Sequence, residues 1–279
     1  MDAPNKQDLI VNQLRPFYFD DLHVRGCLVQ LDARLIPDGQ RQTENPASID
    51  LVGQALVAVA LMSSGLKGFE SLLLQTRDMG PIQLLLAECT HEGHLRGAAH
   101  LRQGNIDSIE GGQLLMSLEA QGQRFQSIVP LATDLASSME LYYQRSEQLP
   151  TRLIIRSNSS RFAGILLQVT ATTNPNQSLQ DFEHALALLN TIKDEELLQL
   201  EPATLLNRLY HEHACRLLDG QTLHFVCRCS RERSLRALQT LGNDDLHELF
   251  VEQNGRVEVR CDLCRTPYIF VPTDVLTHH

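Results

Sequence analysis

Residues 226–233 read VCRCSRER and residues 261–264 read CDLC, and these two stretches decide how the C-terminal part of the chain folds. They place four of the seven cysteines in two close pairs. A Cys-x-x-Cys turn brings two sulfurs to one point, and the outer residues of Cys-x-Cys project to the same side. Zinc prefers four soft ligands in a tetrahedron, so the pairs predict a four-thiolate zinc site. Its predicted ligands are Cys227, Cys229, Cys261 and Cys264.

The tail that carries these cysteines, residues 221–279, has few large apolar residues and many charged ones. Such a segment buries too little apolar surface to fold on a core of its own. Metal binding contributes roughly 10–16 kcal/mol to the folding of small zinc domains. We therefore expect the metal to hold the tail folded, and a purely structural zinc is one interpretation.

Arginines surround the predicted site, and positive charge favours the thiolate, the form of cysteine that binds metal and reacts with oxidants. The same arginines would also offset the negative charge of zinc with four thiolates. His224 is close to Cys227 in sequence and could compete as a ligand, although four thiolates are the simpler set. The arginines are Arg228, Arg231, Arg233, Arg260 and Arg265.

If an oxidant attacks, neighbouring thiolates are placed to form the disulfides Cys227–Cys229 and Cys261–Cys264. A disulfide stabilises a fold by closing a loop, and the effect grows with the logarithm of loop length. These loops are tiny, so each stabilises by far less than the ~3 kcal/mol expected for a 15-residue loop. Oxidation would remove the folding energy of the metal and return little, and we expect the tail to unfold.

Residues 22–170 consist mostly of short strand-like runs broken by turn signals. Two helical segments interrupt them, at 46–62 and 133–148. The most apolar run, 51–66, is too short and too interrupted to span a bilayer and predicts a buried helix. The mixture predicts an α+β fold, with an antiparallel sheet packed on helices, over a first domain of residues 1–174.

The stretch TTNPNQS (172–178) indicates a loop or domain boundary, after which the pattern becomes helical. A helix is expected to open at Ser178, with Asp181 at capping-box spacing. Apolar residues at helical period follow, and we expect this stripe to pack on the first domain until the tail unfolds. The stripe consists of Leu179, Phe182, Leu186 and Leu189.

A second helical stretch begins at about residue 193 and is expected to continue to about 213. The chain after 170 therefore divides into a helical linker, residues 175–220, and the four-cysteine domain, residues 221–279.

The composition of the 279-residue chain is that of an ordinary globular protein, with a net charge of −10. That charge argues against general attraction to nucleic acid or anionic membrane, because both are polyanions. The first residues show no apolar core or cleavage site of a secretory signal, which predicts a reducing, cytoplasmic location. In that setting cysteines are more often metal ligands or redox groups than structural disulfides.

The sequence closely resembles the heat-shock protein 33 family, the redox-regulated holdase chaperones. The resemblance begins with CRCSRER, the gap of residues 230–260, and CDLC followed by TPYIF. It covers roughly residues 20–275. Further matching stretches, in order and spacing, are FQSIVPLATDLASSMELYYQRSEQLPT (125–151) with its SEQ-P-T ending, GILLQ (164–168), DFEHALALLNTI (181–192) and LLNRLYHEH (205–213).

This resemblance implies a substrate-binding α+β domain, a helical linker and a C-terminal zinc domain. In the family the reduced, zinc-bound form is inactive; oxidation releases zinc, forms the two neighbour disulfides and unfolds the switch and the linker. The implied activity is ATP-independent binding of unfolding client proteins, with dimerisation on activation and no enzymatic reaction. The sequence departs from the family pattern at Ser127, at DMGP (78–81) and over 32–48.

Other candidate sites are weak. Cys27, Cys89 and Cys215 stand alone and are expected to be core thiols. HEGH (91–94) and HEH (211–213) lack the i, i+4 histidine spacing of metalloprotease helices, and no phosphate-binding loop or dinucleotide fingerprint is present.

Two alternative functions stay open from the sequence. One is a zinc-ribbon protein that binds nucleic acid or a regulatory partner, although residues 221–279 carry seven Lys/Arg against eight Asp/Glu. The other is a constitutive chaperone whose zinc is structural.

Overall fold

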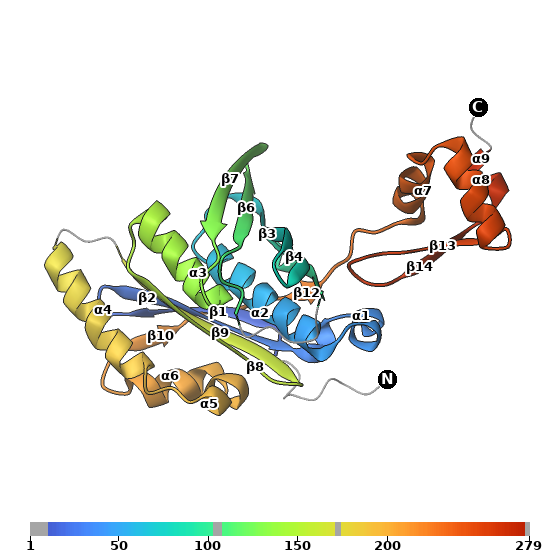
Figure 1. The fold of residues 1–279 in the computed structure, drawn as a ribbon. Coiled ribbons are helices and arrows are strands. Elements are labelled where there is room, and N and C mark those ends of the chain that lie inside the picture. The colour runs from blue at the N-terminus through green and yellow to red at the C-terminus, as the bar shows by residue number, and fades with distance from the viewer. Residues whose placement is uncertain (1–10, 103–107, 171–173, 277–279) are drawn as a thin grey trace.

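The computed structural model describes residues 11–102, 108–170 and 174–276, and Figure 1 shows two sheets, flanking helices and a small C-terminal unit that projects from the rest. The first sheet has the order β10-β1-β2-β9-β8, with β11 also paired to β1, and its strands are antiparallel. Its strands are β1 (Gln13–Phe19), β2 (Val24–Asp32), β8 (Thr151–Ser157), β9 (Arg161–Val169), β10 (Cys215–Leu217) and β11 (Gln221–Thr222).

The second sheet has the order β12-β5-β4-β3-β6-β7 and is antiparallel except for the parallel pair β12–β5. Its strands are β3 (Phe69–Met79), β4 (Ile82–Thr90), β5 (His94–Leu101), β6 (Gln113–Ala120), β7 (Gln123–Pro130) and β12 (His224–Phe225). The expected α+β fold with antiparallel sheets is therefore confirmed.

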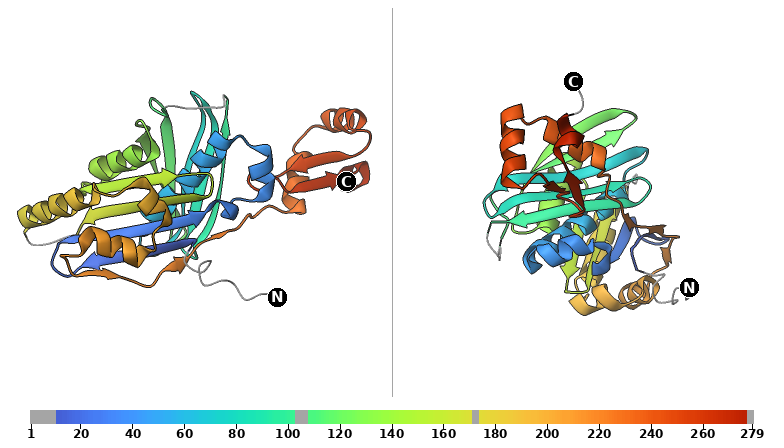
Figure 2. Two further views of the ribbon diagram at one scale, coloured as in Figure 1. Left: turned by 90° about the horizontal axis from the view of Figure 1, so that it is seen from below. Right: turned by 90° about the vertical axis from the view of Figure 1, so that its right-hand side faces the viewer.

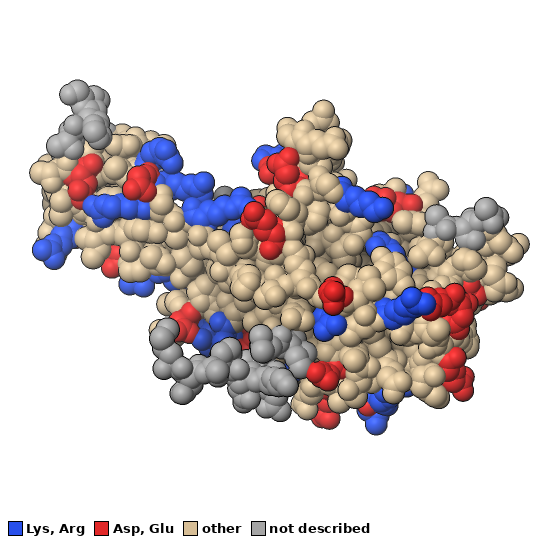
Figure 3. Space-filling model, turned by 180° about the vertical axis from the view of Figure 1, so that it is seen from behind, with Lys and Arg blue, Asp and Glu red and all other residues tan. Residues whose placement is uncertain are grey.

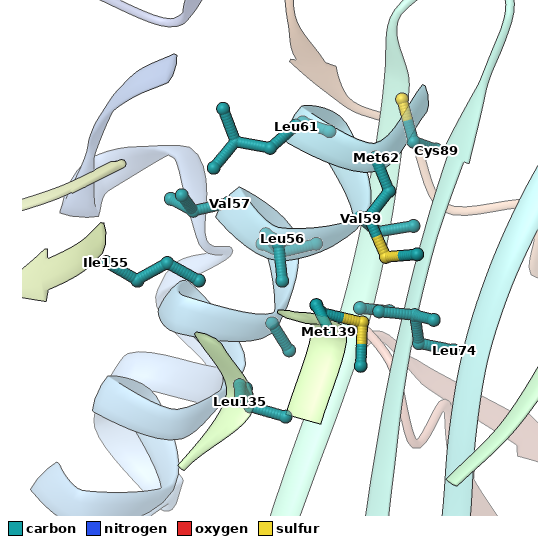
Figure 4. Packing of buried hydrophobic residues seen from close by; sticks show 14 of the residues in the cluster. Leu56, Val57, Val59, Leu61, Met62, Leu74, Cys89, Leu135, Met139 and Ile155 are labelled. Atoms are coloured by element: carbon teal, nitrogen blue, oxygen red, sulfur yellow. The ribbon is translucent and has the colours of Figure 1, made fainter. Parts of the chain in front are cut away.

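The helix α2 (Pro46–Ser63) packs against both sheets and forms the centre of the main core (Figure 4). It starts sharply because the Asn45 side chain accepts a hydrogen bond from the Ser48 N–H and Pro46 occupies the first helical position. By length and composition it is the one described helix apolar enough to cross a membrane, yet 72% of it is buried inside the fold. The predicted buried helix is confirmed.

Shorter elements connect these layers. The chain passes through η1 (Ala33–Leu35) and α1 (Asp38–Thr43) before α2. After β7 it forms α3 (Leu135–Tyr142), which continues as one π-helical turn, η2 (Tyr143–Glu147). The helix predicted over 133–148 is thus present with a change of winding at its end.

The linker helices cover the outer face of the first sheet, opposite α2 (Figures 1 and 2). They are α4 (Pro175–Leu189), α5 (Asp194–Gln199) and α6 (Pro202–Tyr210). Phe182 and Leu189 of the predicted stripe are buried there and Leu186 is partly buried, whereas Leu179 is 46% exposed.

Two expectations for the linker are wrong in detail. The helix begins at Pro175 and not at Ser178, because the Asn174 side chain caps it and proline suits the first turn. The helix expected from about 193 to 213 is broken before Pro202, which lacks the N–H that a continuous helix needs.

The C-terminal unit consists of α7 (Arg231–Gln239), α8 (Asn243–Glu252), β13 (Val257–Arg260), β14 (Pro267–Phe270) and α9 (Pro272–Leu276). It has a small apolar cluster, which the sequence analysis did not predict. The buried members are Leu238, Leu246, Phe250, Val257, Phe270 and Val275.

A close contact beneath the linker gives a test of this packing. Gly26 pairs with Phe17 across β1 and β2, and a Cβ added at Gly26 would lie 2.0 Å from Phe17 Cζ. We expect Gly26→Ala to lower the free energy of unfolding by about 1–3 kcal/mol, because overpacked cores are strained. Denaturant unfolding of Gly26→Ala, Phe17→Leu and the double variant measures the coupling; simple addition of the two costs would contradict the contact.

Candidate metal centre

The four cysteines of the C-terminal unit come from two segments that the fold brings together. Cys227 and Cys229 lie in the extended chain between β12 and α7. Cys261 and Cys264 lie in the turn between β13 and β14, where the Arg265 N–H donates to the Cys261 carbonyl (2.8 Å). Arg265 adopts a left-handed conformation (φ 59°), which closes this turn. The ligand atoms of all four cysteines lie within 4.8 Å of one another.

The sulfur geometry fits a metal ion. Cys227 Sγ is 3.6 Å from Cys261 Sγ, and Cys229 Sγ is 3.4 Å from Cys264 Sγ. Sulfurs at the corners of a tetrahedral zinc site are about 3.8 Å apart, given Zn–S bonds near ~2.3 Å. All four cysteines are free thiols and half-buried. The four cysteines are therefore close enough to hold a metal ion through an all-thiolate donor set.

The thiols of the centre ionise unequally. Burial raises the pKa of Cys227 and of Cys261. Burial also opposes ionisation of Cys264, but hydrogen bonds from Thr266 outweigh it and lower the Cys264 pKa to about 7. The Thr266 hydroxyl lies 3.1 Å from the Cys264 sulfur. Cys264 thus becomes a thiolate more readily than Cys227 or Cys261.

A tyrosine hydroxyl gives similar support to a second sulfur. Tyr268 Oη lies 3.1 Å from Cys229 Sγ, and this contact raises the Tyr268 pKa to about 12. A hydroxyl that keeps its proton can donate it to a thiolate. Hydrogen-bond partners of this kind orient metal ligands. The sequence analysis did not predict these two hydroxyls. Closeness in sequence was the available signal, because Thr266 and Tyr268 follow Cys264 within one turn of the chain.

The arginines expected around the sulfurs have other partners. Arg231 pairs with Asp274 (2.8 Å) and lies over the Phe270 ring, and Arg260 pairs with Glu258. Arg233 donates to the Arg228 carbonyl (2.7 Å), and Arg228 Nη1 is 3.8 Å from Glu88 Oε1. Figure 3 shows arginine side chains over this part of the molecule, with Asp and Glu side chains among them. Among the described residues, the sulfurs of the centre contact hydroxyls and other sulfurs, and the arginines pair with carboxylates or a backbone carbonyl.

Arg265 attaches the centre to the first part of the chain. Its guanidinium donates to Glu44, which also accepts a hydrogen bond from His100 Nδ1 (3.1 Å). The Arg265 and Glu44 side chains are only 21% and 14% exposed. Gln40 donates to the Leu263 carbonyl between the last two cysteines. Glu44 and Gln40 lie over 200 residues from Cys261 and Cys264, and no local pattern pointed to them.

The remaining candidates lie elsewhere. Cys27 and Cys89 are buried core thiols as expected, and burial raises the pKa of Cys89 to about 11. Cys215 is only half-buried at the start of β10. His224 pairs with His94 in the β12–β5 ladder, and the metal-binding group found in the described residues consists of the four cysteines.

Comparisons with known proteins agree with this arrangement. The profile of the family described as "Hsp33 protein" matches residues 12–271. The 33 kDa chaperonin of Pseudomonas syringae pv. syringae is 37% identical, with 98% of this chain and 94% of that protein covered. The 33 kDa chaperonin of Vibrio cholerae is 39% identical, with coverage of 93% and 92%. The fold is similar to the crystal structure of the Thermotoga maritima 33 kDa chaperonin, with a TM-score of 0.77, 23% identity and coverage of 95% and 97%.

The donor set predicts a metal affinity that rises with pH. Cys227 and Cys261, whose pKa values are raised, must lose protons before they bind a metal. We expect the metal-free chain to bind one equivalent of Co²⁺ with the absorption of a tetrahedral thiolate complex, more tightly at pH 8 than at pH 6. Cys264→Ser should abolish that absorption, and Cys215→Ser should leave it unchanged. A spectrum insensitive to Cys264→Ser would exclude the four-cysteine site.

The ion pair between Glu44 and Arg265 predicts that a residue outside the four-cysteine centre affects the rate of metal loss. Glu44→Gln leaves the half-buried Arg265 without a carboxylate partner, which weakens docking of the cysteine turn. We expect transfer of metal to a chelator to become about tenfold faster. The control is Asp262→Asn, since Asp262 is 79% exposed and 3.9 Å from Arg265. Equal transfer rates for the two variants would contradict the role of Glu44.

Proposed function

The chain belongs to the Hsp33 family, and from that premise we propose that it is a redox-regulated, ATP-independent holdase that protects unfolding proteins from aggregation under oxidative stress. The observation that carries the proposal is that four thiols converge just after β12, where the chain leaves the second sheet. In the proposed cycle the reduced form binds one zinc ion through Cys227, Cys229, Cys261 and Cys264 and is inactive. Zinc is the proposed ion because four thiolates in a tetrahedron leave no open position for catalysis.

Oxidation is proposed to form the disulfides Cys227–Cys229 and Cys261–Cys264. In each case two thiolates give two electrons to a peroxide, an S–S bond forms, the O–O bond breaks, and two protons complete two water molecules. The lowered pKa of Cys264 favours its thiolate as the first nucleophile. With its sulfurs used in disulfides the centre no longer holds zinc, and the small apolar cluster of the C-terminal unit is left as its main support.

The route from the centre to the linker is short. The chain before Cys227 consists of β11 and β12, each of two residues, and β10, of three. Strands this short are held by few hydrogen bonds, so we propose that unfolding of the tail spreads through them to the linker helices. Leucines of α5 and α6 and the side chain of Phe182 lie on an apolar patch of the first sheet, defined by Phe17, Phe19, Val24, Leu28, Ile165 and Leu167.

Loss of the linker would expose that patch and the linker's own apolar stripe. Large exposed apolar patches are binding surfaces for other proteins. We propose three functional parts, residues 1–174 for client binding, 175–220 as linker and 221–279 as redox switch. The oxidised protein is proposed to be a homodimer that acts in the cytoplasm on unfolded or misfolded clients. The proposed activity involves no enzymatic step, nucleic acid or membrane.

A zinc-ribbon function in nucleic-acid binding has less support. Arg231, Arg260 and Arg265 are engaged by Asp274, Glu258 and Glu44. A binding surface for polyanions needs arginines that are available for phosphates.

The decisive experiment treats the zinc-loaded chain with peroxide at mildly unfolding temperature. We expect zinc release, followed with a chromogenic chelator, to coincide with suppression of light scattering by an aggregating client. In Cys264→Ser we expect no peroxide-dependent release of zinc and no accompanying gain in protection of the client. Cys215→Ser should behave like the parent chain. Zinc that stays bound, or leaves without a gain in protection, would contradict the redox switch.

The same samples test the pairing by mass spectrometry of the oxidised chain. We expect bridges within each cysteine pair. The short sulfur contacts in the folded state join Cys227 to Cys261 and Cys229 to Cys264, so the two pairings are distinguishable. Dominant bridges between the pairs, including Cys229–Cys261, would contradict the neighbour disulfides.

A further inference from the structure

A cleft with a volume of about 330 Å³ opens between the two sheets at the C-terminal end of α2. Its walls are mainly apolar, and its floor contains Arg25 of β2 and Gln168 of β9. The apolar wall is formed by Met62, Leu66, Leu72, Met116, Leu118 and Phe125. This composition, a concave apolar surface with few polar groups, is typical of small-ligand sites. Neither the cysteine centre nor the linker patch includes these residues.

The Arg25 side chain is held in one orientation. Its Nε and Nη2 both donate to Gln168 Oε1, at 3.1 and 2.5 Å. Gln168 Nε2 in turn donates to Thr151 Oγ1 (2.9 Å), and Thr151 donates to the Leu149 carbonyl (3.0 Å). Thr151 is the last residue of the SEQ-P-T stretch, so this chain of hydrogen bonds connects that motif to the arginine.

A glycine makes room for the guanidinium. A Cβ added at Gly65 would lie 2.5 Å from Arg25 Nη2. Any larger residue at 65 would displace the arginine from the floor of the cleft. The space at Gly65 and the acceptor at Gln168 together fix where the positive charge lies.

The charge of Arg25 lacks a carboxylate partner. Within the part of the chain that the structure describes, no Asp or Glu oxygen lies within 4.0 Å of the Arg25 guanidinium, and its Nη1 makes no hydrogen bond. A guanidinium among apolar side chains is costly unless an anion pairs with it. The free Nη1 is therefore a donor available to a bound carboxylate.

The helix that borders the cleft is irregular at this point. The π-helical turn η2 places Tyr143 in the wall, and the next residue after the turn, Gln148, is left-handed (φ 55°). π-Helical turns and left-handed non-glycine residues cluster at functional sites, because regular winding would be more stable. Glu147 lies at the exposed rim and accepts a hydrogen bond from Tyr142 Oη (2.8 Å).

We propose that this cleft binds a small amphiphilic carboxylate, with its apolar body between the sheets and its carboxylate on Arg25. The apolar wall favours an aliphatic or aromatic body, and the oriented guanidinium favours a single compact anion. Glu147 at the rim disfavours a second negative charge at the outer end of the ligand. The class is therefore a monocarboxylate with an unbranched or aromatic apolar chain.

Octanoate tests the proposal, with octanol as the matched ligand that lacks the charge. Calorimetric titration of the full metal-loaded chain should show one site for octanoate and binding of octanol weaker by about tenfold or more. Arg25→Gln should reduce octanoate affinity to that of octanol. Arg216→Gln removes a remote arginine, one paired with Asp20, and should change neither affinity. Equal octanoate binding by the parent and a folded Arg25→Gln chain would overturn the proposal.

A second variant covers the case in which Arg25→Gln disturbs the fold. Ser127→Phe fills the cleft from β7 and leaves the contacts of Arg25 with Gln168 in place. We expect it to abolish binding of both ligands while thermal unfolding stays close to that of the parent. If octanoate fails to bind the parent, and Ser127→Phe weakens protection of an unfolding client, the cleft is a polypeptide surface and the proposal is wrong.

Discussion

The convergence of four sulfurs within 4.8 Å is the constraint on which the C-terminal part of this structure depends. Among the described side chains of that unit, the buried apolar cluster has six members, too few to offset the entropy of ordering about 50 residues. A metal bound to the four sulfurs would supply the missing stability. Hydroxyls also contact two of the sulfurs: Thr266 favours the thiolate of Cys264, and Tyr268 lies against Cys229.

The four-cysteine centre also contacts the first part of the polypeptide. Arg265, next to the last cysteine, is buried against Glu44 and His100, so the cysteine turn is part of the first domain's surface. On the other side of the centre, the short strands β10 to β12 return the chain to both sheets. The linker helices then cover the outer face of the first sheet. In the proposed switch, loss of the centre would reach that cover through these short strands.

The first domain presents two apolar surfaces with different construction. The outer face of the first sheet is hidden by α4, α5 and α6. The cleft between the sheets is open, and Arg25 at its floor is oriented by Gln168 and Thr151. A covered apolar face suits regulated binding of unfolded chains, whereas an open cleft with a fixed charge suits a small ligand.

Sequence patterns identified the cysteine cluster, the buried helix α2 and the α+β class, because each depends on short spacings. Two cysteines close in sequence reach one point, and an apolar run of helical length must be buried. Helix boundaries were less well predicted, since Asn174 and Pro202 outweigh the apolar period that surrounds them. The predicted residue boundaries of the linker and of the four-cysteine domain stay predictions.

What the sequence determined by itself is therefore the donor chemistry of the tail, four thiols in two close pairs. The tertiary structure alone decided the partners of those groups. Glu44 meets Arg265 across more than 200 residues, Gln168 orients Arg25, and the arginines pair with carboxylates rather than sulfurs. Local spacing cannot encode such contacts, because they exist only after the sheets and helices have packed.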